Sequence, residues 1–194
     1  AYKKKHPSSA HKCMIIENGY DESVFLKIQE KNTDIKSRKF LMLHSGIIYP
    51  GDRDPSSFLL AIKNLLESNR IEINDIKVRF RAPQHEAELL NLVKQLKMED
   101  VVEIAPSIAY SAAIAEMQSA DLLLVFQGTN FNTQVPAKIY EYIRAGRSIL
   151  ALVDQEGDTA KKLKEFHGIH IADINSHKTI EYEIISPPKC EDLF

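Results

Sequence analysis

The feature that most constrains the fold of this chain is a regular alternation between short apolar runs and longer segments with helical spacing. The apolar runs are expected to be strands, and they cover residues 40–45, 76–80, 101–104, 121–126, 148–153 and 169–172. The segments between them place apolar residues three and four positions apart, which is typical of a helix with one buried face. Strands and helices that alternate in this way form βαβ units with right-handed crossovers. The sequence therefore predicts an α/β fold: a doubly wound, mostly parallel sheet of about six strands with helices on both faces.

Length and composition fit a single good-sized domain. The chain has 194 residues, of which 44% are hydrophobic, and its formal net charge is -2. This charge provides no basic field that would attract nucleic acid. The two cysteines, Cys13 and Cys190, lie near opposite ends without the spacing of metal ligands, so neither a disulfide framework nor a zinc site is expected, and a reducing cytoplasm fits best. No run approaches the roughly 20 apolar residues of a membrane span.

The loops that follow the strands are where a ligand is expected. In doubly wound sheets, ligands lie outside the carboxyl ends of the strands, where helix N-termini supply backbone N–H groups and a positive dipole end. The loops in question are 46–54, 81–83, 105–107 and 127–135.

The first of these loops combines a glycine with an arginine. Gly46 ends the first strand, and Arg53 comes just before the next helix. A residue without Cβ lets a phosphate approach the backbone, and a guanidinium can hold a phosphate through two parallel hydrogen bonds. On this loop alone, a plain strand-to-helix turn with a surface arginine explains the pattern as well.

The fourth loop leads into a helix that reads PAKIYEYIRAG from Pro136. Lys138 and Glu141 are three residues apart and share a face near the start of this helix. The cation can meet a diphosphate, and the carboxylate can accept hydrogen bonds from the two vicinal hydroxyls of a ribose. The spacing is equally compatible with an exposed ion pair between the two side chains.

Several other functions lack their motif. The chain contains neither G-x-G-x-x-G after the first strand nor G-x-x-x-x-G-K-[ST], which disfavours a dinucleotide cofactor and a P-loop nucleotide. It also lacks a G-x-S-x-G nucleophile elbow. His44 could act as an acid or base, but a lone histidine at the end of a strand is expected more often to be a hydrogen-bonded core or loop residue.

Four stretches, in this order, resemble the retaining GT-B glycosyltransferases of the large bacterial "group 1" class. MIIENGYDESVF from Met14 looks like the segment that joins the two halves of such enzymes, and HSGIIYPGDRDPSSFLLAI from His44 looks like the opening of the second half. VEIAPSIAYSAAIAEMQSADLLLVF from Val102 resembles the stretch that holds the base. VPAKIYEYIRAGRSILAL from Val135 is the most specific, and it is similar to the signature of members that make surface polysaccharides.

The resemblance implies a role for each candidate residue. Gly46, Arg53 and Lys138 would face the diphosphate of a nucleotide sugar. Glu141 would bind the ribose, and the backbone around Ser107 and Ile108 would receive the base.

One position departs from the family pattern. Many members carry a glutamate for the donor sugar where this chain has Thr133, so contacts to the sugar are expected from Thr133 and Gln134. No residue of the chain can be assigned as catalytic.

The resemblance also implies a domain organisation. Residues 1–38 would be an interdomain linker or edge segment, and residues 39–194 the Rossmann-like donor-binding domain. The N-terminal half, which holds the acceptor, is not part of this chain, so we expect the chain to bind a UDP- or GDP-sugar without turning it over.

For the full-length enzyme, the resemblance implies a function and its requirements. It predicts sugar transfer to a saccharide or lipid-linked acceptor in polysaccharide biosynthesis, without a cofactor or a metal. It predicts a cytoplasmic enzyme and allows peripheral association with the inner membrane. Two alternatives stay open: a non-catalytic Rossmann-like interaction module, and a GT-B fold epimerase that acts on the nucleotide sugar.

Overall fold

The computed structural model describes residues 2–14, 16–27, 38–49 and 51–186. Within these residues, six parallel strands form one sheet in the order β3-β2-β1-β4-β5-β6. The strands are β1 (Phe40–Ser45), β2 (Ile76–Arg81), β3 (Val102–Ala105), β4 (Leu122–Phe126), β5 (Ser148–Leu152) and β6 (Ile169–Ala172). The predicted doubly wound α/β fold is confirmed, and each strand begins and ends within one residue of its predicted bounds.

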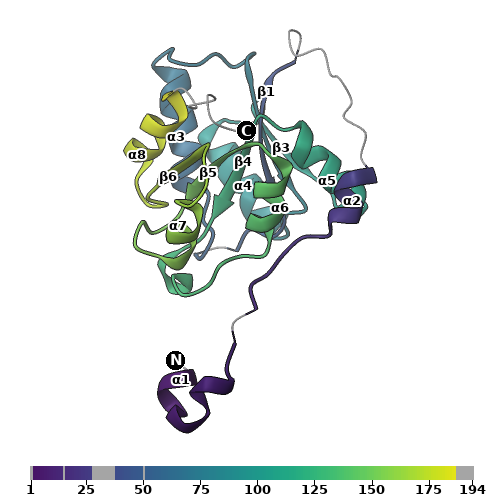
Figure 1. Ribbon diagram of the computed structural model, residues 1–194. Helices are drawn as coiled ribbons and strands as arrows, with labels where there is room; N and C mark the ends of the chain where they lie inside the picture. Colours follow the sequence, from purple (N-terminus) through teal and green to yellow (C-terminus); the bar gives the residue numbers. More distant parts are fainter. Residues whose placement is uncertain (1, 15, 28–37, 50, 187–194) are drawn as a thin grey trace.

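Helices cover both faces of this sheet (Figure 1). The helices that follow the strands are α3 (Ser56–Glu67), α4 (Glu86–Leu96), α5 (Tyr110–Ser119), α6 (Lys138–Ala145), α7 (Asp158–Leu163) and α8 (His177–Ile185). Helices α3, α4 and α8 contribute to one apolar cluster with the sheet, and α5, α6 and α7 contribute to a second. The sheet is therefore the middle layer of three.

The strands read as continuous apolar runs because both of their faces are buried. Met42 packs in the cluster on the α3 side, and its neighbour Leu43 packs in the cluster on the α6 side. In β4, Leu122, Leu124 and Phe126 face the first cluster, while Leu123 and Val125 face the second. This alternation is the two-residue repeat of a strand, with both sides apolar because both sides are covered.

The order of the strands reverses at β1, which positions the functional site. The chain runs from β1 outward to β2 and β3, then crosses back to pair β4 with the other side of β1. The loops that leave β1 and β4 therefore begin side by side at the carboxyl ends of these two strands, the place where ligands lie in doubly wound sheets. These are the first and the fourth of the candidate loops.

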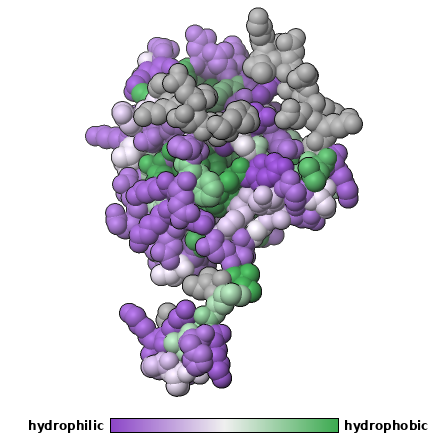
Figure 2. Space-filling model, in the orientation of Figure 1, coloured by the Kyte–Doolittle hydropathy of each residue, from purple (hydrophilic) through white to green (hydrophobic). Residues whose placement is uncertain are grey.

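The segment that precedes the sheet lies partly on the domain and partly away from it. The helices α1 (Tyr2–Lys5) and η1 (Pro7–Lys12) lie away from the sheet in Figure 1, and Figure 2 shows that this part is mostly hydrophilic. By contrast, α2 (Glu22–Lys27) packs on α5. Its Phe25 is buried beneath the Arg144 guanidinium, whose carbon lies 5.2 Å from the ring centroid. The assignment of residues 1–38 as an interdomain linker stays a prediction, and residues 1, 15 and 28–37 lie outside the described residues.

Candidate functional site

Lys138 is the centre of the candidate site. It is the first residue of α6, and its Nζ donates a hydrogen bond of 2.8 Å to the carbonyl oxygen of Ser45 at the end of β1. Nζ also lies 3.2 Å from Nε2 of His44. The side chain thus bridges from the start of α6 to the end of β1.

His44 is a buried partner of this lysine. Its Nδ1 lies 2.9 Å from the carbonyl oxygen of Leu124, and a carbonyl can only accept. Nδ1 therefore carries the hydrogen, and Nε2 accepts from the ammonium of Lys138. Burial holds the pKa of His44 well below its ordinary value, so the ring is neutral. Of the two interpretations of this histidine, the structure supports a hydrogen-bonded core residue.

The surroundings of Lys138 disfavour the charged form of its amino group. Burial, and after it the charge of Arg53, lower the pKa of Lys138 to about 7, while the charge of Glu141 opposes the shift. A buried cation near a second cation is stabilised when an anion binds beside it. The arrangement is suited to receive a phosphate.

Gly46 makes room for this lysine. Its φ is +109°, which strains any residue with a Cβ, and a Cβ there would come 3.2 Å from Nζ of Lys138. The neighbouring Ser45 N–H donates to the hydroxyl of Tyr142, at 3.0 Å, so the end of β1 is tied to α6 a second time. The structure therefore brings the predicted residues Gly46 and Lys138 into direct proximity.

Arg53 lies in the loop between β1 and α3, at the same carboxyl edge of the sheet as Lys138. Its Nη1 donates to the carbonyl oxygen of Ile47, at 3.0 Å, and its guanidinium lies over the ring of Tyr49, 5.0 Å from the centroid. The charge of Arg53 lowers the pKa of both Lys138 and His44. These contacts fix the arginine in the loop that follows β1, and they use only part of its five N–H donors.

Glu141 is held by a residue that the sequence did not single out. The hydroxyl of Tyr110 donates to Oε1 of Glu141, at 2.7 Å. This hydrogen bond, followed by burial, raises the pKa of Tyr110 to about 12. Lys138 and Glu141 therefore use different partners, although they share one face of α6. The only signal for Tyr110 in the sequence is its place at the start of a helix, two residues after the expected base-binding loop.

The loop at residues 127–135, the expected donor loop, is held in place by hydrogen bonds from buried side chains. It contains the short helix η3 (Thr129–Phe131), and the buried Gln127 donates from Nε2 to the carbonyl oxygens of Phe131, at 2.8 Å, and Gln134, at 2.9 Å. Thr159, at the start of α7, donates to the same Gln134 oxygen at 2.8 Å. The side chains of Thr133 and Gln134 are exposed, so the backbone is fixed while the predicted sugar-binding groups face solvent. Sequence reasoning missed the role of Gln127.

Asp52 joins the first loop to the donor loop. Its carbonyl oxygen accepts from the N–H of Gly128, at 2.5 Å, and its Oδ1 accepts from Nδ2 of Asn130, at 3.0 Å. A Cβ at position 128 would lie 2.9 Å from the Asp52 carbonyl oxygen. Gly128 is therefore needed for the two loops to approach this closely.

The predicted base-binding residues follow β3. Ser107 and Ile108 are exposed, and the side chain of Ile108 offers an apolar surface at this rim. Arg81 fixes the start of the loop because its Nη1 donates to the carbonyl oxygen of Pro106, at 2.7 Å. The same guanidinium is held by two hydrogen bonds to Glu116 of α5, at 2.7 and 2.8 Å. Whether the loop binds a base stays a prediction.

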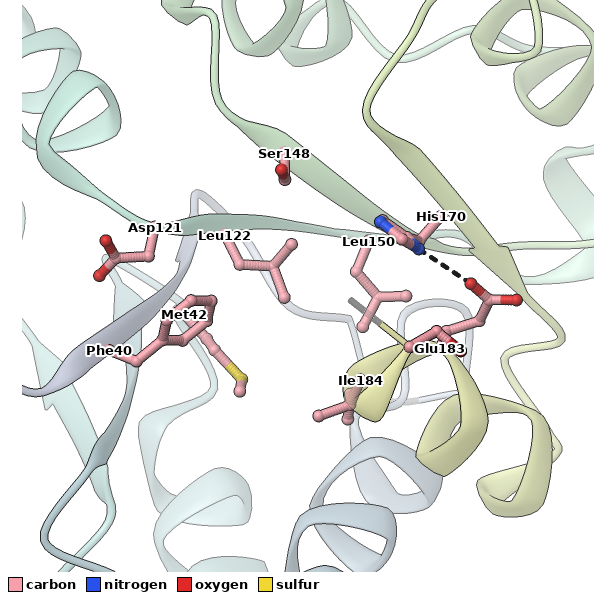
Figure 3. A pocket seen from close by; sticks show the side chains of 10 residues that line it. Phe40, Met42, Asp121, Leu122, Ser148, Leu150, His170, Glu183 and Ile184 are labelled. Atoms are coloured by element: carbon pink, nitrogen blue, oxygen red, sulfur yellow. Dashed lines mark hydrogen bonds and ion pairs between the residues drawn. The ribbon is translucent and has the colours of Figure 1, made fainter. Parts of the chain in front are cut away.

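Two cavities lie outside these contacts. One of about 190 Å³ lies between the first loop and α4, lined by residues that include Ile48, His85 and Leu89. The other, of about 40 Å³, lies at the amino edge of the sheet, where His170 bonds to Glu183 at 2.9 Å (Figure 3). Neither is lined by Lys138, Arg53 or Glu141, and the second is too small for a nucleotide, since ligand pockets hold roughly 300–1,000 Å³.

Two further properties concern the described part of the chain. It contains no group of three or more His, Cys, Asp or Glu side chains that could hold a metal ion. None of its helices combines the length and the apolar character needed to cross a bilayer.

Comparisons with known proteins identify the fold. No family model and no curated protein matches the chain. Among solved structures, WaaG, a glycosyltransferase involved in lipopolysaccharide biosynthesis, is 18% identical over 78% of this chain and 38% of its own, with a TM-score of 0.60. Anabaena Alr3699/HepE in complex with UDP-glucose is 15% identical over 91% of this chain and 47% of its own, with a TM-score of 0.66.

A third similar structure is that of a putative enzyme of another class, an epimerase. The putative UDP-N-acetylglucosamine 2-epimerase from Listeria monocytogenes is 11% identical over 84% of this chain and 41% of its own, with a TM-score of 0.58. The chain thus spans less than half the length of each of these three structures. At these identities the likeness shows the fold: a Rossmann-like domain of the kind found in GT-B glycosyltransferases.

Proposed function

We propose that this chain is the donor-binding half of a glycosyltransferase that moves a sugar from a UDP- or GDP-sugar to a saccharide or lipid-linked acceptor in polysaccharide biosynthesis. The observation that carries the proposal is the position of Lys138: its ammonium lies beside Gly46, at the carboxyl end of β1 where the strand order reverses, and the charge of Arg53 acts on it. This combination of backbone access and positive charge suits a diphosphate. The fold that the chain shares with HepE, solved with UDP-glucose, supports the same assignment.

In this proposal the loops after β1, β3 and β4 and the start of α6 each contact one part of the donor. Gly46, Arg53 and Lys138 hold the diphosphate, Glu141 accepts from the ribose hydroxyls, and the loop at Ser107 and Ile108 receives the base. The sugar lies against Thr133 and Gln134. In the intact cytoplasmic enzyme, the positive groups and the N-terminus of α6 would stabilise the charge that develops on the leaving nucleoside diphosphate, without a metal ion. The chain alone would bind the donor and leave it unchanged.

Calorimetric titration of the chain with UDP, GDP and UDP-glucose in the presence of EDTA tests the proposal. We expect at least one of these to bind. Lys138→Ala and Glu141→Ala should each weaken binding by about 1–3 kcal/mol, the scale for losing a hydrogen bond to a charged group. The exposed Lys161→Ala on α7 and Glu67→Ala on α3 are matched controls that should leave the affinity unchanged.

Absence of both heat and a thermal shift with every nucleotide would overturn the proposal and favour a non-catalytic interaction module. A nucleotide-sugar epimerase is a second candidate, because the Listeria structure shares the fold. Epimerisation breaks a C–H bond of the sugar, so it incorporates deuterium from D2O. Deuterium in UDP-N-acetylglucosamine recovered after incubation with the chain would favour the epimerase; we expect none.

A further inference from the structure

Tyr110 connects α5, which follows the proposed base-binding loop, to α6, which carries Glu141. It is the first residue of α5, and its hydroxyl donates to Oε1 of Glu141 in the first turn of α6, at 2.7 Å. The side chain of Tyr110 is 48% exposed, so this contact is made at the open rim and not in the core. At this place Tyr110 lies between the proposed base-binding loop and Glu141, the group proposed to bind the ribose.

The hydrogen bond from Tyr110 orients the Glu141 carboxylate and leaves most of its acceptor positions available for a ligand. A glutamate side chain loses roughly 1.5–2 kcal/mol of conformational freedom when it is held in one rotamer. Because the Tyr110 hydroxyl already restricts the Glu141 side chain before a ligand binds, less conformational entropy is lost on binding; the carboxylate is preorganised. A carboxylate has about four acceptor positions, and Tyr110 occupies one. Among the described residues no other group bonds to the Glu141 carboxylate, so the second position on Oε1 and both positions on Oε2 can accept from a pair of hydroxyls.

The hydroxyl of Tyr110 keeps its proton at neutral pH. The bond to Glu141 and burial raise the pKa of Tyr110 to about 12. Tyr110 therefore acts on Glu141 as a constant donor, in contrast to Lys138, whose charge changes near neutrality.

We propose that Tyr110 is the positioning residue for ribose recognition: its hydroxyl orients the Glu141 carboxylate so that both oxygens can accept from the vicinal 2′- and 3′-hydroxyls of the donor nucleotide. This inference rests on the proposed function, because it requires a nucleotide at this rim. It makes the discrimination between ribose and 2′-deoxyribose depend on a side chain that need not itself contact the sugar hydroxyls.

The test compares ribonucleotides with their 2′-deoxy forms. The dissociation constants of UDP and 2′-deoxy-UDP, and of GDP and 2′-deoxy-GDP, are measured by calorimetry for the unaltered chain, Tyr110→Phe and Glu141→Gln. We expect the unaltered chain to prefer the ribonucleotide. Tyr110→Phe keeps the ring and removes the hydroxyl, so the preference should fall about fivefold or more, with a smaller loss for the deoxynucleotide, which has only its 3′-hydroxyl to bind Glu141. In the Glu141→Gln background, Tyr110→Phe should have little further effect.

The matched control is Tyr140→Phe. Tyr140 is also on α6 and also donates to a glutamate, Glu17, at 3.0 Å, but it lies outside the proposed site. This variant should bind all four nucleotides as the unaltered chain does.

The outcomes separate this inference from the function on which it rests. If the unaltered chain binds no nucleotide, the proposed function fails. If it binds with a preference for ribose that Tyr110→Phe leaves intact, the function stands and the inference is overturned. An equal loss for both forms would mean that Tyr110 contacts the base, and tighter binding would mean that it obstructs the site; either result also overturns the inference.

Discussion

The Nζ atom of Lys138 lies 3.2 Å from Nε2 of His44, and this contact joins the start of α6 to the end of β1. Because Nδ1 of His44 donates to the Leu124 carbonyl, Nε2 can only accept while the ring is neutral. The lysine is held among buried groups with Arg53 nearby, and its pKa is about 7. The charge at the centre of the site therefore changes within the physiological range.

The first prediction concerns the pH dependence of donor binding. Between pH 6 and 9 the diphosphate diester of UDP-glucose does not titrate, so a change in affinity reports on the protein. Above the pKa of about 7, the lysine loses its proton and must recover it to hold the phosphate. We expect the dissociation constant of UDP-glucose to rise by up to about tenfold per pH unit above this pKa. Calorimetry in buffers of equal ionic strength measures it, and Lys138→Met should bind weakly with a flat profile.

The second prediction concerns stability. The pKa of Lys138 falls from an ordinary value of 10.5 to about 7 on folding, so between these values the unfolded chain binds more protons. The free energy of unfolding should then rise with pH through this window, and the charged lysine should destabilise the fold below it. Lys138→Met should therefore gain more stability, relative to the unaltered chain, at pH 6 than at pH 9. Urea unfolding at both pH values measures this; an equal effect at both would contradict it.

The third prediction separates two glycines of the first loop. Gly46 and Gly51 have φ values of +109° and +89°, so alanine strains the backbone at either position by about 1–3 kcal/mol. Only at Gly46 would the added Cβ meet Lys138; at Gly51 it meets nothing within 4 Å. Both variants should unfold more easily in urea, but only Gly46→Ala should also weaken UDP-glucose binding. A similar loss of affinity in Gly51→Ala would show that strain, and not the lysine, is responsible.

The fourth prediction concerns the support of the donor loop. Gln127→Leu removes two hydrogen bonds of a buried side chain, although the Phe131 carbonyl keeps the Gln134 N–H and the Gln134 carbonyl keeps the Thr159 hydroxyl as donors. At about 0.5–1.5 kcal/mol for each hydrogen bond, the loss should cost about 1–3 kcal/mol of stability. Hydrogen exchange of the backbone amides at 129–134 should become faster, and the affinity for UDP-glucose should fall. The exposed Gln155→Leu is the control and should change neither property. Unchanged exchange in the loop would contradict the supporting role of Gln127.

The fold could be predicted from the sequence because its determinants are local and repetitive. Apolar runs such as 121–126 need only be recognised as buried on both sides to indicate parallel strands. The final helix, α8, was not predicted because its apolar positions are few, although Ile180 is fully buried in the cluster on the α3 side. Its N-cap, Ser176, accepts from the Thr179 N–H at 3.4 Å, a weak signal that the sequence does contain.

The site could be predicted only in part, because contacts across the sheet do not follow from spacing. Helical periodicity placed Lys138 and Glu141 on one face, but it could not show that the first bonds to His44 and Ser45 and the second to Tyr110. The hydroxyl of Tyr110 reaches a residue 31 positions away, so nothing near it in the sequence indicates the contact.

Because the carbonyl oxygen of Asp52 accepts from Gly128 and its carboxylate from Asn130, the loops after β1 and β4 are joined at Asp52. An insertion in one of them would pull that residue out of register with the other. Altering the preferred sugar by loop exchange would therefore require transplanting residues 46–54 and 127–135 together, as a matched pair from one parent.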